Sequence, residues 1–220
     1  YVATRTRFDK VNRIDGNNHL ILLCKNETGY KNLIKMVSAG FTEGFYSKPR
    51  IDKQLLEKYH DGLICLSACL AGEIPKALLA GDYDRARQTA LWYRDLFGAE
   101  NYYIELQDHG LEEDQAVLPQ LIRLARETGI PMVATNDAHY IILLCIQTGK
   151  TINDVDRMEF QTDEFYLKST DEMYDLFSMV PEACENTNKI AEQCNFEFTF
   201  GETKLPYFKA PNGMENQEYF

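Results

Sequence analysis

Short apolar runs alternate with amphipathic stretches through the first two thirds of the chain, and this alternation is its most constraining feature. The four runs with the length of buried strands are residues 19–24, 62–67, 102–106 and 131–135. Between the runs, stretches such as 84–97 and 112–128 place apolar side chains at helical spacing and end at glycine. Asn26 is placed to cap a helix after the first run, with Leu33, Ile34 and Val37 on its apolar face. Strands that alternate with helices are typical of βα units, so the pattern predicts an α/β fold with a parallel sheet.

The pattern changes after residue 151. Residues 171–180 and 181–194 have the character of two helices, and residues 196–200 alternate as a strand would. Residues 204–213 contain prolines and a glycine, which is typical of a linker. The chain therefore predicts one main domain followed by a short C-terminal appendage.

Composition excludes several classes of protein. The chain has 23 Lys and Arg against 34 Asp and Glu, a net charge of −11, which excludes a bulk basic surface for nucleic acid. No apolar stretch approaches the ~18 residues that a membrane helix needs. The 6 cysteines form no CxxC pair, so we expect reduced thiols in a cytoplasmic protein.

The strongest chemical signal follows the strand candidate 131–135. Asp137 and His139 lie just after it, and a carboxylate and an imidazole two residues apart can bind a metal ion at the end of a sheet. The alternative is a turn capped by Asp137 with a surface histidine. Cys69 follows the strand candidate 62–67 and offers a thiolate, although a lone cysteine is more often a small buried hydrophobe.

Other polar residues are weaker candidates. Asp108 and His109 follow residues 102–106, and the simplest interpretation is a polar turn that ends at a glycine. Contact of these side chains with a bound phosphate or with metal ligands stays open. Arg50 lies in a basic segment that either touches phosphates or forms a solvated loop. His19 precedes its strand, which in an all-parallel sheet would place it at the opposite edge from Cys69.

Several long strings of the chain resemble one known family. These strings are residues 26–33, 44–52, 66–75, 105–110, 134–140, 144–151 and 163–168. In them the sequence is similar to the PHP (polymerase and histidinol phosphatase) domain of bacterial DNA polymerase III alpha subunits, which are C-family replicative polymerases.

The resemblance implies a fold and a domain division. The family's domain is a distorted (β/α)7 barrel, and this chain would be an incomplete fragment that lacks the first βα units. Residues 1–195 would form the partial PHP domain, and residues 196–220 a linker or the start of the polymerase palm region. A polar segment that the family has between Tyr140 and Leu144 is missing here.

The resemblance also implies a metal site. His19, Cys69, Asp137 and His139 match metal-ligand positions of the family, which holds divalent ions, zinc or manganese. The family's other ligands precede the start of this chain. Magnesium would serve only the polymerase domain, which this chain does not contain. Asp108, His109 and Arg50 remain candidates for contacts to the ligands or to phosphate.

The implied function is that of a fragment of a DNA-directed DNA polymerase, whose PHP domain has a phosphoesterase or 3′–5′ exonuclease type of site. With four ligands we expect fewer bound metals and little or no nuclease activity. The implied partners are DNA, through the full-length polymerase, a sliding clamp and a proofreading subunit, with no membrane. Two alternatives stay open: a non-catalytic docking module, and a stand-alone PHP phosphatase, which residues 144–168 disfavour.

Overall fold

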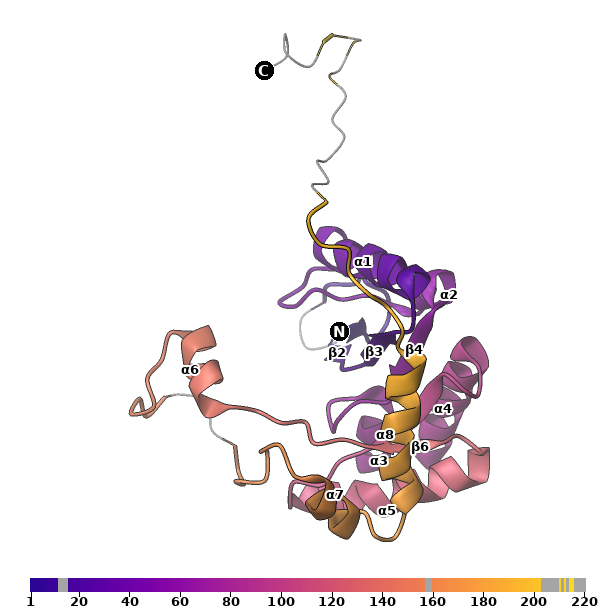
Figure 1. Cartoon of the computed structure of the whole chain (residues 1–220), viewed down its shortest axis with the longest axis vertical. Coiled ribbons are helices and arrows are strands. Elements are labelled where there is room, and N and C mark those ends of the chain that lie inside the picture. The colour runs from indigo at the N-terminus through magenta and orange to yellow at the C-terminus, as the bar shows by residue number, and fades with distance from the viewer. Residues whose placement is uncertain (12–15, 157–159, 203–209, 211, 213, 216–220) are drawn as a thin grey trace.

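The computed structural model describes residues 1–11, 16–156, 160–202, 210, 212, 214 and 215. Its main sheet has 4 strands in the order β3-β4-β5-β6. The strands are β3 (Ile21–Cys24), β4 (Leu63–Leu66), β5 (Tyr102–Leu106) and β6 (Met132–Ala134). All four were predicted, and the mixed α/β class is confirmed (Figure 1).

The alternation predicted a parallel sheet, but the observed sheet is mixed. β4, β5 and β6 are parallel, but β3 runs antiparallel to β4, with Ile21 opposite Leu66 and Cys24 opposite Leu63. β3 is also an edge strand with no fully buried residue, rather than the buried strand expected. A separate antiparallel pair joins β1 (Val2–Ala3) to β2 (Asn17–Asn18). Within the described residues the strands do not close into a barrel, so the seven-unit barrel stays a prediction.

Eight helices accompany the strands in the described residues. They are α1 (Glu27–Thr42), α2 (Lys53–Tyr59), α3 (Glu73–Leu79), α4 (Tyr83–Phe97), α5 (Glu112–Thr128), α6 (Ile141–Thr148), α7 (Thr170–Leu176) and α8 (Pro181–Gln193). Asn26 caps α1 as expected, because its side chain accepts a hydrogen bond from the Gly29 amide. α8 lies along β6, where Asn186 donates to the carbonyl of Met132 at 2.7 Å (Figure 1).

The buried face of α1 differs from the one predicted. Ile34 and Val37 were expected in the core but are 46% and 48% exposed, whereas Met36 is fully buried. The cause is a backbone contact at the start of the helix: a Cβ on Gly29 would lie 2.0 Å from the carbonyl oxygen of Gly62. This close approach sets the rotation of the helix about its axis. The face that contains Gly29 and Met36 therefore turns toward the core.

Residues 196–200 do not form the predicted strand. The aromatic rings of Phe196 and Phe198 instead pack on Tyr30 of α1, at centroid distances of 4.8 and 5.1 Å. The predicted linker at 204–213 lies outside the described residues, apart from 210 and 212. The domain boundary at residue 195 stays a prediction.

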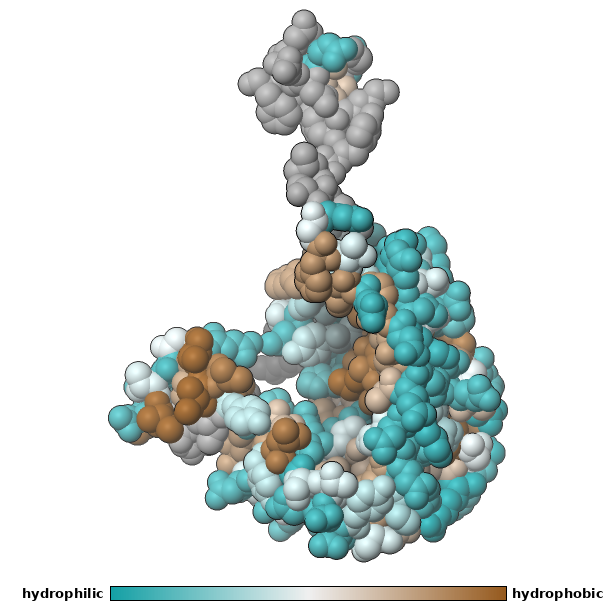
Figure 2. All heavy atoms as spheres, viewed as in Figure 1, coloured by the Kyte–Doolittle hydropathy of each residue, from teal (hydrophilic) through white to brown (hydrophobic). Residues whose placement is uncertain are grey.

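α6 lies on an arm that projects from the body of the molecule (Figure 1). Its apolar side chains Ile142, Leu143 and Ile146 are 66%, 61% and 72% exposed, and they form a brown patch in Figure 2. Among the residues that the structure describes, no helix combines the length and the apolar character needed to cross a membrane.

Candidate metal site

The direction of β3 brings the candidate ligands to one edge of the sheet. The carboxyl ends of β4, β5 and β6 share this edge because these strands are parallel. β3 begins there because it is antiparallel to β4. His19, two residues before β3, therefore lies beside the loop that follows β4. We had expected His19 at the opposite edge from Cys69, but the two residues lie at the same edge.

His19 and Cys69 face each other across this edge. The Nδ1 atom of His19 lies 3.4 Å from the Sγ atom of Cys69, and the His19 amide donates to the carbonyl of Ala71 at 3.0 Å. The turn that carries Cys69 is tight, because a Cβ on Gly72 would lie 2.4 Å from the carbonyl oxygen of Ser67. These contacts hold the imidazole and the thiol in one place.

Burial shifts both groups toward their neutral forms. Desolvation lowers the pKa of His19, and the positive charge of Lys76 adds to this effect. Desolvation also raises the pKa of the Cys69 thiol. A neutral imidazole is the form that binds metals, and a bound cation would stabilise the thiolate.

Asp137 and His139 form the second pair, after β6. Their Oδ1 and Nε2 atoms lie 3.2 Å apart, and the two side chains are 34% and 38% exposed. Asp137 has a φ of 43°, in the left-handed region, where a side chain is strained. The charge of Asp137 acts against the lowering of the His19 pKa and contributes to the raised pKa of Cys69, so the two pairs lie within electrostatic reach.

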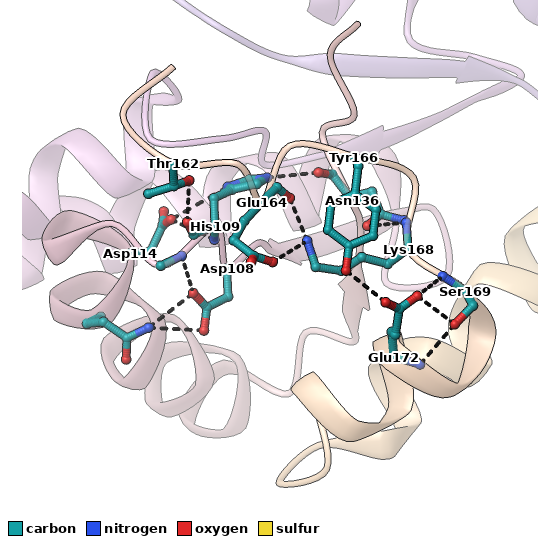
Figure 3. A network of polar contacts seen from close by, with 12 residues as sticks. Asp108, His109, Asp114, Asn136, Thr162, Glu164, Tyr166, Lys168, Ser169 and Glu172 are labelled. Carbon is teal, nitrogen blue, oxygen red and sulfur yellow. Dashed lines mark hydrogen bonds and ion pairs between the residues drawn. The ribbon is translucent and has the colours of Figure 1, made fainter. Parts of the chain in front are cut away.

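His109 holds the loop between β6 and Asp137. Its Nε2 atom lies 2.8 Å from the carbonyl oxygen of Asn136, and its Nδ1 atom lies 3.5 Å from Asp114 (Figure 3). Its ring stacks on Phe165 at a centroid distance of 4.0 Å. Burial alone would lower the pKa of His109, but the hydrogen bonds to Asp114 and Asn136 outweigh it and raise the pKa. A protonated His109 donates to both partners at once.

A later segment of the chain covers the same loop. The hydroxyl of Thr162 donates to the carbonyl of His109 at 2.7 Å (Figure 3). The amide of His139 donates to the carbonyl of Phe165 at 2.8 Å, and the amide of Lys168 donates to Asn136 at 3.4 Å. The Asp137–His139 pair is therefore positioned by segments on both sides of it in the sequence.

Asp108 and Arg50 have structural contacts. Asp108 accepts from the amide of Gly110 at 2.9 Å, and Gly110 has a φ of 73°, which matches the polar turn predicted first. Arg50 is fully buried and donates to the carbonyls of Gly44 at 3.2 Å and Asp9 at 2.7 Å. This placement favours a structural role for Arg50 over contact with phosphate.

Sequence reasoning missed Glu105, on β5. The residue is 4% exposed, and its carboxylate accepts hydrogen bonds from Ala68, Gln107 and Thr135 at 2.9, 3.1 and 2.6 Å. Burial raises its pKa, against the opposing effect of these hydrogen bonds. The available signal was a charged residue inside an otherwise uncharged buried strand, because such a group needs partners.

The donor atoms of the candidate ligands suit a divalent cation, but the four side chains form two separate pairs. Imidazole and thiolate are ligands of zinc, and a carboxylate suits zinc or manganese. In the described part of the chain, no three His, Cys, Asp or Glu side chains converge as a metal-binding group. Two pairs at one edge are consistent with a partial site.

Comparison with known proteins agrees with this architecture. The PHP domain family matches residues 2–109. The chain is 47% identical to a DNA polymerase III subunit alpha of Treponema pallidum, over 100% of this chain and 20% of that protein. It is 45% identical to the DNA polymerase III subunit alpha of Borreliella burgdorferi, over 96% of this chain and 19% of that protein. It is 39% identical to the DNA polymerase III subunit alpha of Thermus aquaticus, over 100% of this chain and 19% of that protein.

The family match identifies residues 2–109 as a PHP domain, and the mixed α/β fold agrees with this match. The chain is similar to the PHP region of bacterial DNA polymerase III alpha subunits. The chain spans about a fifth of the length of these curated relatives.

Proposed function

We propose that the chain is the PHP region of a replicative DNA polymerase alpha subunit, and that its sheet edge binds a divalent metal ion in a phosphoesterase type of site. The observation that carries the proposal is the antiparallel β3, which brings His19 within 3.4 Å of Cys69 at the edge that also bears Asp137 and His139. The similarity to DNA polymerase III alpha subunits supports the choice of parent protein.

The residues of the chain would divide the work by chemistry. His19 and Cys69 would bind the cation through nitrogen and sulfur, and Asp137 and His139 through oxygen and nitrogen. When bound, a divalent cation supplies Lewis-acid activation of a phosphodiester near neutral pH. His109 and Phe165 would keep Asp137 and His139 in place while substrate enters.

The parent protein would be a DNA-directed DNA polymerase in the cytoplasm. It would contact DNA mainly through its other regions, because this chain has a net charge of −11. A sliding clamp and a proofreading subunit are the proposed protein partners. The chain alone, with two divided ligand pairs, would bind fewer metals than an intact domain and show little or no nuclease activity.

Zinc binding by the purified chain tests the metal site. Equilibrium dialysis with Zn²⁺ would show binding that is weakened at least tenfold by His19→Ala and by His139→Ala. The control is His60→Ala, because His60 lies at the end of α2 and contacts the carbonyls of Leu56 and Glu57. Binding that both site variants retain would contradict the proposal. Strong degradation of a 3′-labelled primer in Mn²⁺, abolished by His139→Ala, would contradict the expected inactivity of the chain alone.

A docking module is the second candidate, and the arm favours it. Ile142, Leu143 and Ile146 expose a contiguous apolar surface on α6, which is typical of a protein-binding site. Pull-down of purified proofreading subunit or sliding clamp by the chain tests this role. Ile146→Asp would abolish capture if α6 is the docking surface, and unchanged capture would exclude α6.

A further inference from the structure

We infer that Glu105 is the positioning residue of the metal site, which aligns the loop of Cys69 with the loop of Asp137. This inference rests on the proposed metal-binding function. Glu105 is not itself placed as a ligand. Its position in the sheet is what suggests the role, because β5 lies between β4, which leads to Cys69, and β6, which leads to Asp137.

The two carboxylate oxygens of Glu105 face opposite loops. Oε2 accepts from the amide of Ala68, one residue before Cys69, at 2.9 Å. Oε1 accepts from the hydroxyl of Thr135, two residues before Asp137, at 2.6 Å, and from Gln107 at 3.1 Å. One side chain thus spans from the loop of one ligand pair to the loop of the other.

The backbone of the same strand reinforces the connection. The Glu105 amide donates to the hydroxyl of Ser67 at 2.8 Å, just before the Cys69 turn. The Thr135 amide donates to the carbonyl of Leu106 at 3.0 Å. The carboxylate therefore acts from a fixed main chain, and its oxygens have little freedom to follow a loop that moves.

Both loops contain strained residues that need such support. Ala68 has a φ of 65° and Asp137 a φ of 43°. An alanine in the left-handed region is disfavoured, and the surrounding contacts must hold it there. The hydrogen bond from the Ala68 amide to Glu105 is a contact of this kind, and it holds the backbone immediately before the Cys69 thiol.

An ionised carboxylate suits this position better than an amide does. The Ala68 amide can only donate, and the Gln107 side chain donates to the other oxygen. A glutamine at position 105 would have one acceptor oxygen, so one loop would lose its acceptor without any change in side-chain volume. Buried hydrogen bonds to a carboxylate are also stronger than those to a neutral amide.

Glu105→Gln tests the inference, with two readouts. In the metal-free chain, hydrogen exchange of the amides at 67–70 or 135–139 would be at least tenfold faster than in the wild type. Titration with Co²⁺, followed by the thiolate-to-metal absorption band, would show affinity reduced by about 10- to 100-fold. The matched control is Asp52→Asn, because Asp52 is a carboxylate 1% exposed that caps α2 and pairs with Arg7, rather than with either ligand loop. It would change neither readout.

Thr135→Val is a second variant for the case in which Glu105→Gln folds poorly. It removes the hydroxyl that donates to Oε1 and leaves the Ala68 contact, so exchange would rise at 135–139 and stay unchanged at 67–70. Wild-type exchange and Co²⁺ affinity in both variants would overturn the inference. If the wild type bound no Co²⁺, the proposed metal function would fail, and the exchange readout alone would decide whether Glu105 aligns the two loops.

Discussion

The two candidate ligand pairs lie at the same edge of the sheet but are held there by different means. Cys69 lies in a tight turn, and the amide of His19 donates a hydrogen bond to the carbonyl of Ala71 in the same turn. Main-chain contacts therefore hold this pair. Asp137 and His139 follow the edge strand β6, are one-third exposed, and depend on side chains and loops that come from elsewhere in the sequence. The first pair is held mainly by main-chain contacts, whereas the second also depends on an external clamp. We define this clamp as His109, Asp114 and Phe165.

Removing the clamp would have the largest effect. His109→Ala would lower the free energy of unfolding by about 3 kcal/mol, because it leaves the buried carboxylate of Asp114 without its imidazole partner and opens a gap beside Phe165. Urea denaturation measures the loss. His60→Ala is the control, since His60 is outside the clamp and only half-buried. A loss as small as that of the control would mean that the clamp contributes nothing.

The pH dependence separates the charge of His109 from its size. The pKa of His109 is raised in the folded protein, so its contribution to stability is fully present below the ordinary pKa of histidine, about 6.5. This contribution is lost as the pH rises through the raised folded pKa. The difference in stability between the wild type and His109→Gln would therefore shrink as the pH increases, and a constant difference would assign the effect to packing alone.

Gly72→Ala would damage the first pair by a smaller amount. An added Cβ would meet the carbonyl of Ser67 at 2.4 Å and that of Cys69 at 3.1 Å, so the turn must open at a cost of about 1–3 kcal/mol. Gly40→Ala is the matched control, because its Cβ would find only ordinary contacts at 3.6 Å or more. Calorimetric melting of both variants measures the difference, and equal melting temperatures would show that the turn is not tight.

Asp137→Gly would have the smallest effect on stability, and in the opposite direction. Glycine adopts a φ of 43° without strain, so the free energy of unfolding would rise by roughly 0.5–1 kcal/mol while a ligand is lost. Thermal unfolding monitored by circular dichroism measures the gain. Asp108→Gly is the comparison, since that carboxylate accepts from Gly110 and its loss would destabilise the turn. Destabilisation by Asp137→Gly would show that contacts of the carboxylate outweigh the backbone strain.

Most of the fold could be predicted because local patterns determine it. The periodicity of residues 102–106 and 112–128 predicted β5 and α5 with the bounds observed. The direction of β3 could not be predicted, since a four-residue apolar run carries no information on its partner. The exposed face of α1 was mispredicted because a backbone contact at Gly29, rather than hydrophobic spacing, sets its rotation.

Candidate site residues could be proposed from the sequence only where one residue type stands out. Asp137 and His139 were proposed from their spacing, and Cys69 from its place after a strand, and their role in metal binding stays a prediction. Their association depends on long-range pairing, which spacing does not reveal. Arg50 was read as a surface cation because its buried carbonyl partners lie on other loops. Glu105 was passed over because a single carboxylate inside a strand does not show which loops it joins.

The antiparallel pairing of β3 also has a consequence for folding kinetics. His19 and Cys69 are separated by 50 positions, and the segment between them forms α1, α2 and β4. Closing so long a loop is entropically costly, and folds that depend on contacts between distant residues form slowly. We expect the imidazole and the thiol to meet after the intervening helices have formed. A metal ion would then bind to a chain already folded, rather than serve as the nucleus on which it folds.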